Sequence, residues 1–279
     1  DLYFAHSPLL ALETDFGHGV VLETLSLSIF NYDSAIASAA SRMWTAARGR
    51  PLAEFGSRRM NEYAALAGTR AAYIGGFTST SNLEAGRRYG IPTSGTAAHA
   101  FTLLHESEEA AFASQIETVG VGTTLLVDTY DIPTAVEPAV RVAGPHLGGV
   151  RIDSGDLASL AQRVRMQLDA LGATKTKITV TNDLDEYALA SLQNAPVDSY
   201  GVGTLLVTGS GAPTCAMVYK LSEREGSDGV MVPVAKKSPD KATVPGRKLA
   251  FRSYEYGLAE CEHVISGSEE QLSAFAPQE

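Results

Sequence analysis

Short apolar segments alternate with longer amphipathic segments through the middle of the chain, and this alternation restricts the fold more than any other feature. The candidate strands lie at residues 52–55, 72–77, 91–94, 124–127, 150–153, 178–181 and 199–202. The segments between them have the length of crossover helices, which parallel strands require. We therefore expect an α/β fold in which residues 51–210 form an irregular parallel (β/α) barrel, although an eighth strand is not apparent. An open doubly wound sheet is the alternative, but no Gly-x-Gly-x-x-Gly motif opens the first crossover.

The helical segments have recognisable starts and ends. Apolar residues recur at three- and four-residue steps over residues 19–47, which predicts a long helix that could break in two at Asn31-Tyr32-Asp33. Residues 81–89 are expected to be helical, because Ser81 and Glu84 have the spacing of a capping box. A further helix is expected over residues 157–171.

The two ends of the chain have a different pattern from the middle. Residues 1–17 are typical of short strands, and residues 216–221 and 231–234 of antiparallel strands around a glycine-containing turn. We expect a second, smaller mixed α+β domain built from both ends, with residues 1–50 supplying one part and the connecting helix, and residues 211–279 the remainder. The chain begins at Asp1 without an initiator methionine, so we also expect an N-terminal segment to precede it.

Composition excludes several classes of partner. A net charge of −10 argues against nucleic acid and anionic membranes, because binding to either needs a basic surface. No apolar run approaches the ~20 residues of a membrane span, and no signal peptide opens the chain. Cys215 and Cys261 are far apart and lack metal-ligand spacing. A cytoplasmic protein is therefore expected.

Residues suited to catalysis follow the third, fourth and fifth candidate strands. His99 comes soon after the third, Asp128 and Asp131 follow the fourth, and Asp153 and Asp156 follow the fifth. The carboxyl ends of parallel strands meet on one face of a barrel, so these side chains are expected to converge. A histidine there can act as a nucleophile or carry a proton, and carboxylates can orient it or hold Mg²⁺. The alternative for each is helix capping, which fits Asp156 best.

Two other segments have the character of substrate contacts. Gly201-Val202-Gly203-Thr204 follows the last strand, where barrel enzymes often bind phosphate through backbone N–H groups. Phe55 could stack on a flat ring, and Arg58 could pair with a carboxylate or phosphate, unless they are a core residue and a solvated helical turn. A basic cluster could attract a polyphosphate or simply be a solvated loop; it comprises Lys236, Lys237, Lys241, Arg247 and Lys248.

Six collinear segments resemble motifs of the nicotinate phosphoribosyltransferase family, and the resemblance runs through nearly the whole chain. They are Glu54-Phe55-Gly56-Ser57-Arg58-Arg59, Gly76-Phe77-Thr78-Ser79-Thr80-Ser81-Asn82, Gly95-Thr96-Ala97-Ala98-His99, Val127-Asp128-Thr129-Tyr130-Asp131, Arg151-Ile152-Asp153-Ser154-Gly155-Asp156 and Gly201-Val202-Gly203-Thr204.

The resemblance implies a type II phosphoribosyltransferase that joins nicotinate to phosphoribosyl pyrophosphate and yields nicotinate mononucleotide and pyrophosphate in NAD salvage. It implies ATP as a co-substrate, with His99 as a transiently phosphorylated residue. Asp128, Asp153 and Arg151 are the other catalytic candidates. Mg²⁺ would be bound through pyrophosphate, with Asp153 as its candidate protein contact. A homodimer with shared active sites is also implied.

The same resemblance implies the substrate contacts. Phe55 would stack on the pyridine ring, and Arg58 would meet a substrate's charge. Gly201, Val202, Gly203 and Thr204 would bind the 5-phosphate. The remaining substrate-binding candidates are Ser79, Thr96, Ser154 and Gly155.

Position 79 bears on the choice of ring. The related nicotinamide enzymes have an Asp at this position, which can accept a hydrogen bond from the amide of nicotinamide. Ser79 carries no charge and so does not repel the carboxylate of nicotinate. Nicotinate is therefore preferred. The alternatives are a related enzyme for nicotinamide or quinolinate, and a non-catalytic fragment that only binds phosphoribosyl ligands.

Overall fold

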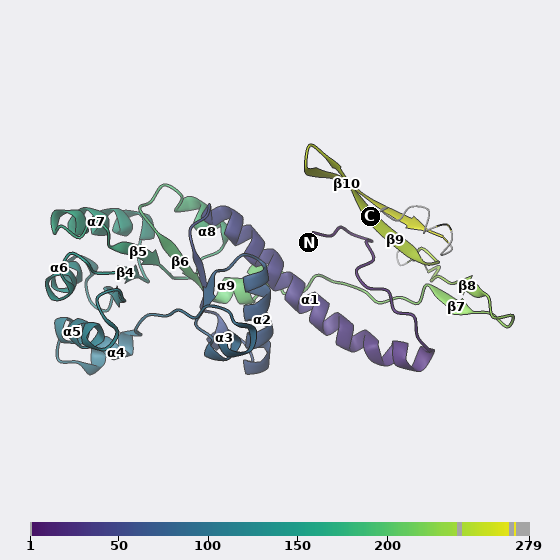
Figure 1. Ribbon diagram of the computed structural model, residues 1–279, viewed down its shortest axis with the longest axis horizontal. Helices are drawn as coiled ribbons and strands as arrows, with labels where there is room; N and C mark the ends of the chain where they lie inside the picture. The colour runs from purple at the N-terminus through teal and green to yellow at the C-terminus, as the bar shows by residue number, and fades with distance from the viewer. Residues whose placement is uncertain (1, 239–241, 268–270, 272–279) are drawn as a thin grey trace. The chain divides into compact units, whose positions relative to one another are not determined.

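The computed structural model describes residues 2–238, 242–267 and 271, which fall into two compact units (Figure 1). Residues 28–217 form the larger unit, and residues 1–27 with 218–279 form the smaller one. No helix in the described part of the chain is both long and apolar enough to cross a membrane.

The larger unit is an α/β structure built on a curled sheet of six parallel strands. In chain order these are β1 (Leu52–Glu54), β2 (Ser79–Thr80), β3 (Thr124–Leu126), β4 (Gly149–Ile152), β5 (Lys177–Val180) and β6 (Ser199–Val202). Their order across the sheet is β2-β1-β6-β5-β4-β3. This is the sequential order of a barrel opened between β2 and β3, since β6 returns to pair with β1. The described residues therefore form half a barrel, and the expected parallel α/β architecture is confirmed at that level.

Helices connect the strands and supply the core. α5 (Glu108–Val119), α6 (Ile132–Ala143) and α7 (Leu157–Ala170) pack side by side along one face of the sheet (Figure 1). Their buried faces are rich in small and branched residues, such as Ala135 and Val136 of α6 and Val164 of α7. These meet buried strand residues including Val150 and Ile178. Burial on this face fixes the register of the strands, and therefore which residues emerge at their carboxyl ends.

Shorter elements complete the larger unit. The 3₁₀-helix η1 (Ser57–Arg59) and helices α2 (Glu62–Ile74) and α3 (Leu83–Tyr89) follow β1 and flank β2. α4 (His99–Leu104) precedes α5. β5 and β6 are connected by α8 (Glu186–Ser191). After β6 come α9 (Thr204–Val207) and η2 (Gly209–Gly211).

Two strand predictions in this unit need correction. Residues 72–77 are not a strand: α2 continues to Ile74, and the strand begins later, at Ser79. The run of small residues at the end of α2 packs as a helix, with Ala71 and Ala72 buried. Residues 91–94 make only a single bridge, between Thr93 and Thr80, so this segment continues the sheet without forming a full strand.

The predicted helices are present, with two differences in detail. α1 (Phe16–Ala47) is continuous through Asn31, whose side chain accepts from the backbone N–H of Met217 at 2.8 Å and does not compete for the helix backbone. The N-cap of α3 is Asn82, which accepts from the N–H of Ala85 at 2.9 Å. The capping box from Ser81 is therefore wrong by one residue.

The smaller unit contains two antiparallel hairpins. β7 (Glu223–Glu225) pairs with β8 (Met231–Pro233), and β9 (Lys248–Glu255) pairs with β10 (Leu258–Ser266). The strand expected at 216–221 is absent, and the hairpin partner lies a few residues later, in β7. Residues 2–15 contain no strand either. Their contacts with the β9–β10 hairpin include a hydrogen bond from the Ser7 hydroxyl to Glu262 and one from the Arg252 guanidinium to the carbonyl of Leu2.

Candidate active site

Three predicted catalytic side chains meet at the carboxyl ends of β3 and β4. His99 is the first residue of α4, and its Nε2 lies 3.6 Å from Oδ2 of Asp153 and 3.9 Å from Oδ1 of Asp128. Its Nδ1 lies 3.4 Å from the hydroxyl of Thr129. The His99 side chain is 43% exposed, so part of it is accessible to a ligand.

Asp128 is the most deeply buried member of this cluster, with a side chain only 2% exposed. Its Oδ2 accepts from the backbone N–H of Asp153 at 2.8 Å and from the hydroxyl of Ser154 at 3.2 Å. Its Oδ1, which faces His99, has no hydrogen-bond partner among the described residues. A buried carboxylate oxygen without a donor is costly, so this atom is prepared for a proton, a cation or a substrate hydroxyl.

Arg151 holds Asp153 in place both directly and through Thr181. The guanidinium donates from Nε to the Thr181 hydroxyl at 2.9 Å and lies 2.9 Å from Oδ1 of Asp153 through Nη2. The Thr181 hydroxyl donates to the same carboxylate oxygen. Burial opposes the charged form of Asp153, but these contacts outweigh it and lower the pKa of the carboxyl below its usual value. Arg151 also donates from Nη1 to Thr96 at 2.8 Å, which fixes the loop before His99.

Ligand atoms of His99, Asp128 and Asp153 all lie within 4.8 Å of one another. Carboxylate oxygens are the donors that Mg²⁺ prefers. The unpartnered Oδ1 of Asp128 is therefore consistent with a cation in this cluster.

The predicted ring-binding and phosphate-binding segments lie together at the ends of β1 and β6. A Cβ built on Gly201 would lie 2.6 Å from the ring of Phe55, so the ring packs directly against the glycine backbone. A Cβ on Gly56 would lie 2.3 Å from Val207 and 3.1 Å from the carbonyl of Gly203. A side chain at either position would clash with these neighbours, so both positions require glycine. The same packing places Phe55 next to the loop that precedes α9. Val202 is fully buried, backbone included, and its carbonyl accepts from the N–H of Phe55 at 2.8 Å.

The remaining predicted substrate contacts lie on loops around these strand ends. Ser79 of β2 has its hydroxyl 2.7 Å from that of Ser94. Arg58 is exposed in η1 and forms no ion pair with any residue the structure describes. Ser154 and Gly155 follow β4. Gly155 has a φ of +81°, and a Cβ built on it would lie 2.8 Å from Cδ1 of Leu160. Thr204 is the first residue of α9.

Sequence reasoning did not single out two residues with a clear place in the site. Thr181 directly follows β5 and donates to Asp153, and its only signal was its position at a strand end. Glu108 begins α5, and burial together with the negative charges of Asp128 and Asp131 raises its pKa to about 7. Its Oε1 is buried without a partner among the described residues. Glu108 carried no sequence signal, because it lies in a run of acidic residues typical of a solvated helix start.

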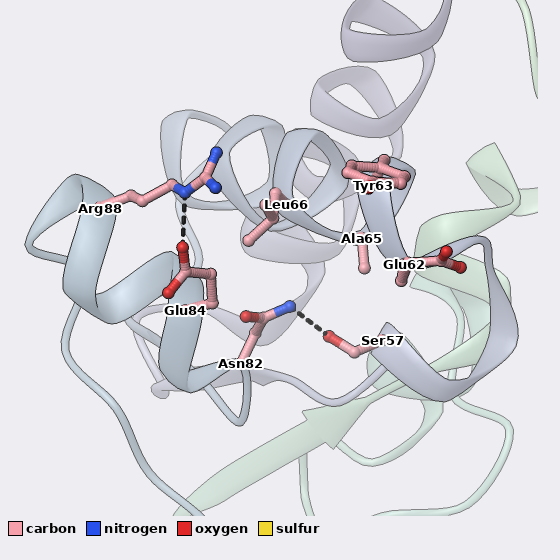
Figure 2. A pocket seen from close by; sticks show the side chains of 8 residues that line it. All are labelled: Ser57, Glu62, Tyr63, Ala65, Leu66, Asn82, Glu84 and Arg88. Atoms are coloured by element: carbon pink, nitrogen blue, oxygen red, sulfur yellow. Dashed lines mark hydrogen bonds and ion pairs between the residues drawn. The ribbon is translucent and has the colours of Figure 1, made fainter.

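A cavity of about 440 Å³ lies away from the His99 cluster, between η1, α2 and α3 (Figure 2). Figure 2 shows Ser57 and Asn82 joined by a hydrogen bond at one side and the Arg88–Glu84 ion pair at another. Tyr63 and Glu62 line it from the start of α2. No predicted site residue lines this cavity.

The basic cluster lies in the smaller unit. Arg247 and Lys248 precede and begin β9, and Lys236 and Lys237 follow β8. Lys241 lies outside the described residues.

Comparisons with known proteins agree with the resemblance. No protein-family model matches the chain. The chain is 59% identical over 260 residues to the nicotinate phosphoribosyltransferase pncB1 of Mycobacterium tuberculosis, covering 90% of this chain and 57% of that protein. It is 41% identical over 263 residues to the nicotinate phosphoribosyltransferase of Bacillus subtilis, covering 90% and 53%. The chain therefore spans about half the length of the curated relatives it matches.

Solved structures give the same result for the fold. The crystal structure of nicotinate-nucleotide pyrophosphorylase from Pyrococcus furiosus matches with a TM-score of 0.76 and 30% identity, over 88% of this chain and 61% of that one. That of human nicotinic acid phosphoribosyltransferase matches with a TM-score of 0.65 and 27% identity, over 83% and 55%. By sequence and by fold, the chain is similar to nicotinate phosphoribosyltransferases over about half of their length.

Proposed function

We propose that this chain carries the active site of an enzyme that joins nicotinate to phosphoribosyl pyrophosphate, giving nicotinate mononucleotide and pyrophosphate in NAD salvage, with hydrolysis of ATP. The observation that carries the proposal is the cluster of His99, Asp128 and Asp153 at the carboxyl ends of parallel strands. Its support from comparison is the homology to named nicotinate phosphoribosyltransferases over 90% of the chain.

The chemistry of the transfer fits the groups present. The bond between ribose C1 and the pyrophosphate oxygen breaks, and the pyrophosphate leaves with the electron pair while positive charge develops on the ribose. Fixed carboxylates stabilise that charge without reorganising, and Asp153 is held ionised by Arg151 and Thr181. The pyridine nitrogen then supplies its own lone pair to C1. The reaction needs no general base, so positioning is the main task of the protein.

The residues present fit Mg²⁺, and Asp153 with Asp128 would hold it. When bound, the ion neutralises charge on the pyrophosphate leaving group. The Oδ1 of Asp128, buried without a partner among the described residues, is an atom that such a charge would satisfy.

His99 is the residue suited to accept a phosphoryl group from ATP. An imidazole nitrogen attacks the γ-phosphorus, the bond from that phosphorus to the bridging oxygen breaks, and ADP leaves with the electron pair. The His99 side chain is partly exposed, so that a nucleotide could reach it from solvent. Hydrolysis of the N–P bond later releases phosphate and restores His99.

The strand ends at β1 and β6 would hold the rest of the substrates. Phe55, packed on Gly201, offers a ring face to the pyridine, and the unpaired Arg58 offers a charge to the nicotinate carboxylate. Backbone N–H groups of Gly203 and Thr204, at the start of α9, are available for the 5-phosphate.

Nicotinate is the ring we propose, because Ser79 brings no negative charge to that side of the site. The experiment that tests this choice offers nicotinate, nicotinamide and quinolinate in equal amounts with phosphoribosyl pyrophosphate, ATP and Mg²⁺, and identifies the mononucleotides by chromatography. Nicotinate mononucleotide as the main product supports the proposal. Nicotinamide mononucleotide as the main product would assign the site to the amide.

A second candidate is a chain that binds phosphoribosyl ligands without turnover. Binding of phosphoribosyl pyrophosphate with no mononucleotide formed would identify it. A homodimer with shared active sites and a cytoplasmic location remain predictions.

A further inference from the structure

Glu54 is a buried carboxylate to which the proposed function gives no role. It is the last residue of β1, and only 1% of its surface is exposed. Burying a charge is costly unless hydrogen-bond donors replace the water that the charge loses. The donors around Glu54 therefore indicate which parts of the chain this carboxylate holds together. The next residue in the chain is Phe55, the proposed contact of the pyridine ring.

Three donors from three different segments meet on the Glu54 carboxylate. The backbone N–H of Gly56, in the turn after β1, donates to Oε1. The hydroxyls of Thr69 in α2 and Thr80 in β2 donate to Oε2 at 3.0 and 2.6 Å. Both threonines are buried, at 2% and 0% exposed. The carboxylate thus joins α2 to the carboxyl ends of β1 and β2.

These contacts continue into a closed network. The hydroxyl oxygen of Thr80 also accepts from the backbone N–H of Asn82 at 2.9 Å. The side-chain amide of Asn82 donates to the Ser57 hydroxyl at 3.0 Å (Figure 2). Ser57 directly follows Gly56, whose N–H returns the path to Glu54. The Glu54 network, which consists of these five residues, therefore ties the turn after β1 to the turn after β2.

The two turns carry the proposed contacts of nicotinate. Arg58 directly follows Ser57, and Ser79 directly precedes Thr80. Phe55 lies inside the first turn. Backbone pairing of β1 with β2 ends at this level, so the side-chain contacts of the network extend the connection between the strands into the turns. A shift of either turn would change the separation of the arginine from the serine.

We propose that Glu54 and Thr80 are positioning residues for the pyridine site, and that the Glu54 network holds Arg58 and Ser79 at a fixed separation that admits nicotinate. The inference rests on the function proposed above. Neither positioning residue contacts the substrate, and each acts through its neighbours in the two turns. Polar groups that are fixed before binding lose less free energy on being ordered, so the network raises the affinity for nicotinate.

The contribution of the Glu54 network should be specific to one of the two substrates. Gly203 and Thr204, the proposed contacts of the 5-phosphate, lie after β6 and at the start of α9, outside the network. Opening the network at Thr80 releases the two turns and leaves that loop in place. It should weaken the binding of nicotinate and leave the affinity for phosphoribosyl pyrophosphate unchanged. A general loss of packing would weaken the binding of both substrates.

Thr80→Val and Thr69→Val form a matched pair that tests the inference. Each exchanges a buried hydroxyl for a methyl and removes one donor from the same oxygen of Glu54. Only Thr80 also accepts from Asn82, so only Thr80→Val opens the network. We expect Thr80→Val to raise KM for nicotinate about tenfold, the effect of losing a hydrogen bond to a charged group, with KM for phosphoribosyl pyrophosphate unchanged. Thr69→Val should change neither KM.

Two further variants complete the test. Thr80→Ser keeps the hydroxyl and should keep the KM for nicotinate of the unaltered chain. Ser57→Ala opens the same network from a partly exposed position, so it tests the inference even where Thr80→Val does not fold. It should also raise KM for nicotinate. An unchanged KM for nicotinate in Thr80→Val and Ser57→Ala, or an equal rise in Thr69→Val, would overturn the positioning role.

Equilibrium dialysis of labelled nicotinate, which needs no turnover, separates this failure from failure of the proposed function. If nicotinate binds the unaltered chain, and binds Thr80→Val more weakly, while no mononucleotide forms, the positioning role stands and the proposed function is wrong. If nicotinate mononucleotide forms with the same KM for nicotinate in all of these variants, the function stands and the positioning role is wrong. An unaltered chain that neither binds nicotinate nor forms the mononucleotide would contradict both.

Discussion

The guanidinium of Arg151 lies 2.9 Å from the carboxylate of Asp153, and both residues come from the same strand end. Side chains two apart along a strand point to the same face, so the pair forms directly from the local backbone. Thr181 of the neighbouring strand contacts both members. The site is therefore held by a small network across β4 and β5, and Asp153 stays ionised within it.

Thr181→Val should loosen this network. The methyl that replaces the hydroxyl can neither accept from Arg151 nor donate to Asp153, so the pKa of the Asp153 carboxyl should rise. We expect kcat to fall about tenfold, the effect of losing one hydrogen bond to a charged group. The acidic limb of the pH–rate profile should move to higher pH. Thr179→Val is the control, because the Thr179 hydroxyl in β5 lies 2.8 Å from that of Ser199 in β6 and has no hydrogen bond to Asp153. An acidic limb that stays in place would contradict the role of Thr181.

His99→Ala should abolish ATP-dependent turnover and leave a slow transfer that ATP does not stimulate. The groups that stabilise the ribose charge remain, while the acceptor of the phosphoryl group is lost. The measurement is the rate of nicotinate mononucleotide formation with and without ATP. His105→Ala is the control, since that histidine only caps α4, 2.8 Å from the carbonyl of Phe101. Unchanged ATP stimulation in His99→Ala would refute the phosphohistidine.

Gly201→Ala should displace the ring of Phe55. The new methyl would lie 2.6 Å from that ring, closer than any ordinary contact, so the ring or the loop after β6 must move. We expect a loss of about 1–3 kcal/mol in the free energy of unfolding and a higher KM for nicotinate. Urea denaturation and steady-state kinetics measure the two effects. Gly122→Ala is the control, because nothing lies within 4 Å of its added methyl. Equal KM values in the two variants would remove Phe55 from the ring site.

Ser79→Asp should shift preference from nicotinate to nicotinamide. A carboxylate at this position repels the carboxylate of nicotinate and accepts a hydrogen bond from the amide of nicotinamide. The ratio of kcat/KM for the two pyridines should change by about tenfold or more in favour of the amide. Ser79→Ala serves as control, because it removes the bond to Ser94 without adding charge. A ratio equal to that of the control would exclude position 79 from ring selection.

Glu108→Gln should stabilise the chain at alkaline pH. Burial and the charges of Asp128 and Asp131 raise the pKa of Glu108 to about 7 from 4.5, so ionising this carboxyl costs free energy only in the folded state. The cost is absent below about pH 4.5, grows as the pH rises to about 7, and remains above it. The variant should be more stable than the parent at about pH 8, by no more than about 1 kcal/mol because Glu108 is partly exposed, and equal to it near pH 4.5. Unfolding midpoints in urea at the two values measure this, and a pH-independent difference would contradict it.

The sequence predicted the parallel sheet well where strands are followed by polar motifs. β6 lies where the apolar run 199–202 placed it, and β3, β4 and β5 differ by about one residue. Most residues of these strands are buried, and aspartate or glycine follows β3, β4 and β6 within two residues, as Asp128, Asp153 and Gly203. The run 72–77 failed because alanine and small residues fit both a buried strand and a tightly packed helix, and only packing of Ala71 and Ala72 decides between them.

The chain ends were harder to predict for a related reason. The apolar residues 9–12 resemble a strand, but an isolated segment becomes a strand only when a partner offers a backbone edge. Here the contacts from Ser7 and Leu2 to the second hairpin are made by side chains or by a single carbonyl. Pairings of this kind join residues far apart in sequence, and no local pattern indicates them.

In the candidate site, strand ends located His99, Asp128 and Asp153, and the structure brings their side chains together. The residues that hold them were not predictable in the same way. Thr181 and Glu108 act through neighbours on other elements, and their residue types are common at strand ends and helix starts.

The most direct test of the account is the stoichiometry of the complete reaction. The chain is incubated with nicotinate, phosphoribosyl pyrophosphate, ATP and Mg²⁺, and nicotinate mononucleotide, ADP and the phosphorylated form of His99 are measured together. We predict that nicotinate mononucleotide accumulates, that ADP forms with it, and that the label from the γ-phosphate appears on His99 when nicotinate is omitted. A folded chain that binds phosphoribosyl pyrophosphate but forms neither nicotinate mononucleotide nor phosphohistidine would contradict the account and identify a binding module.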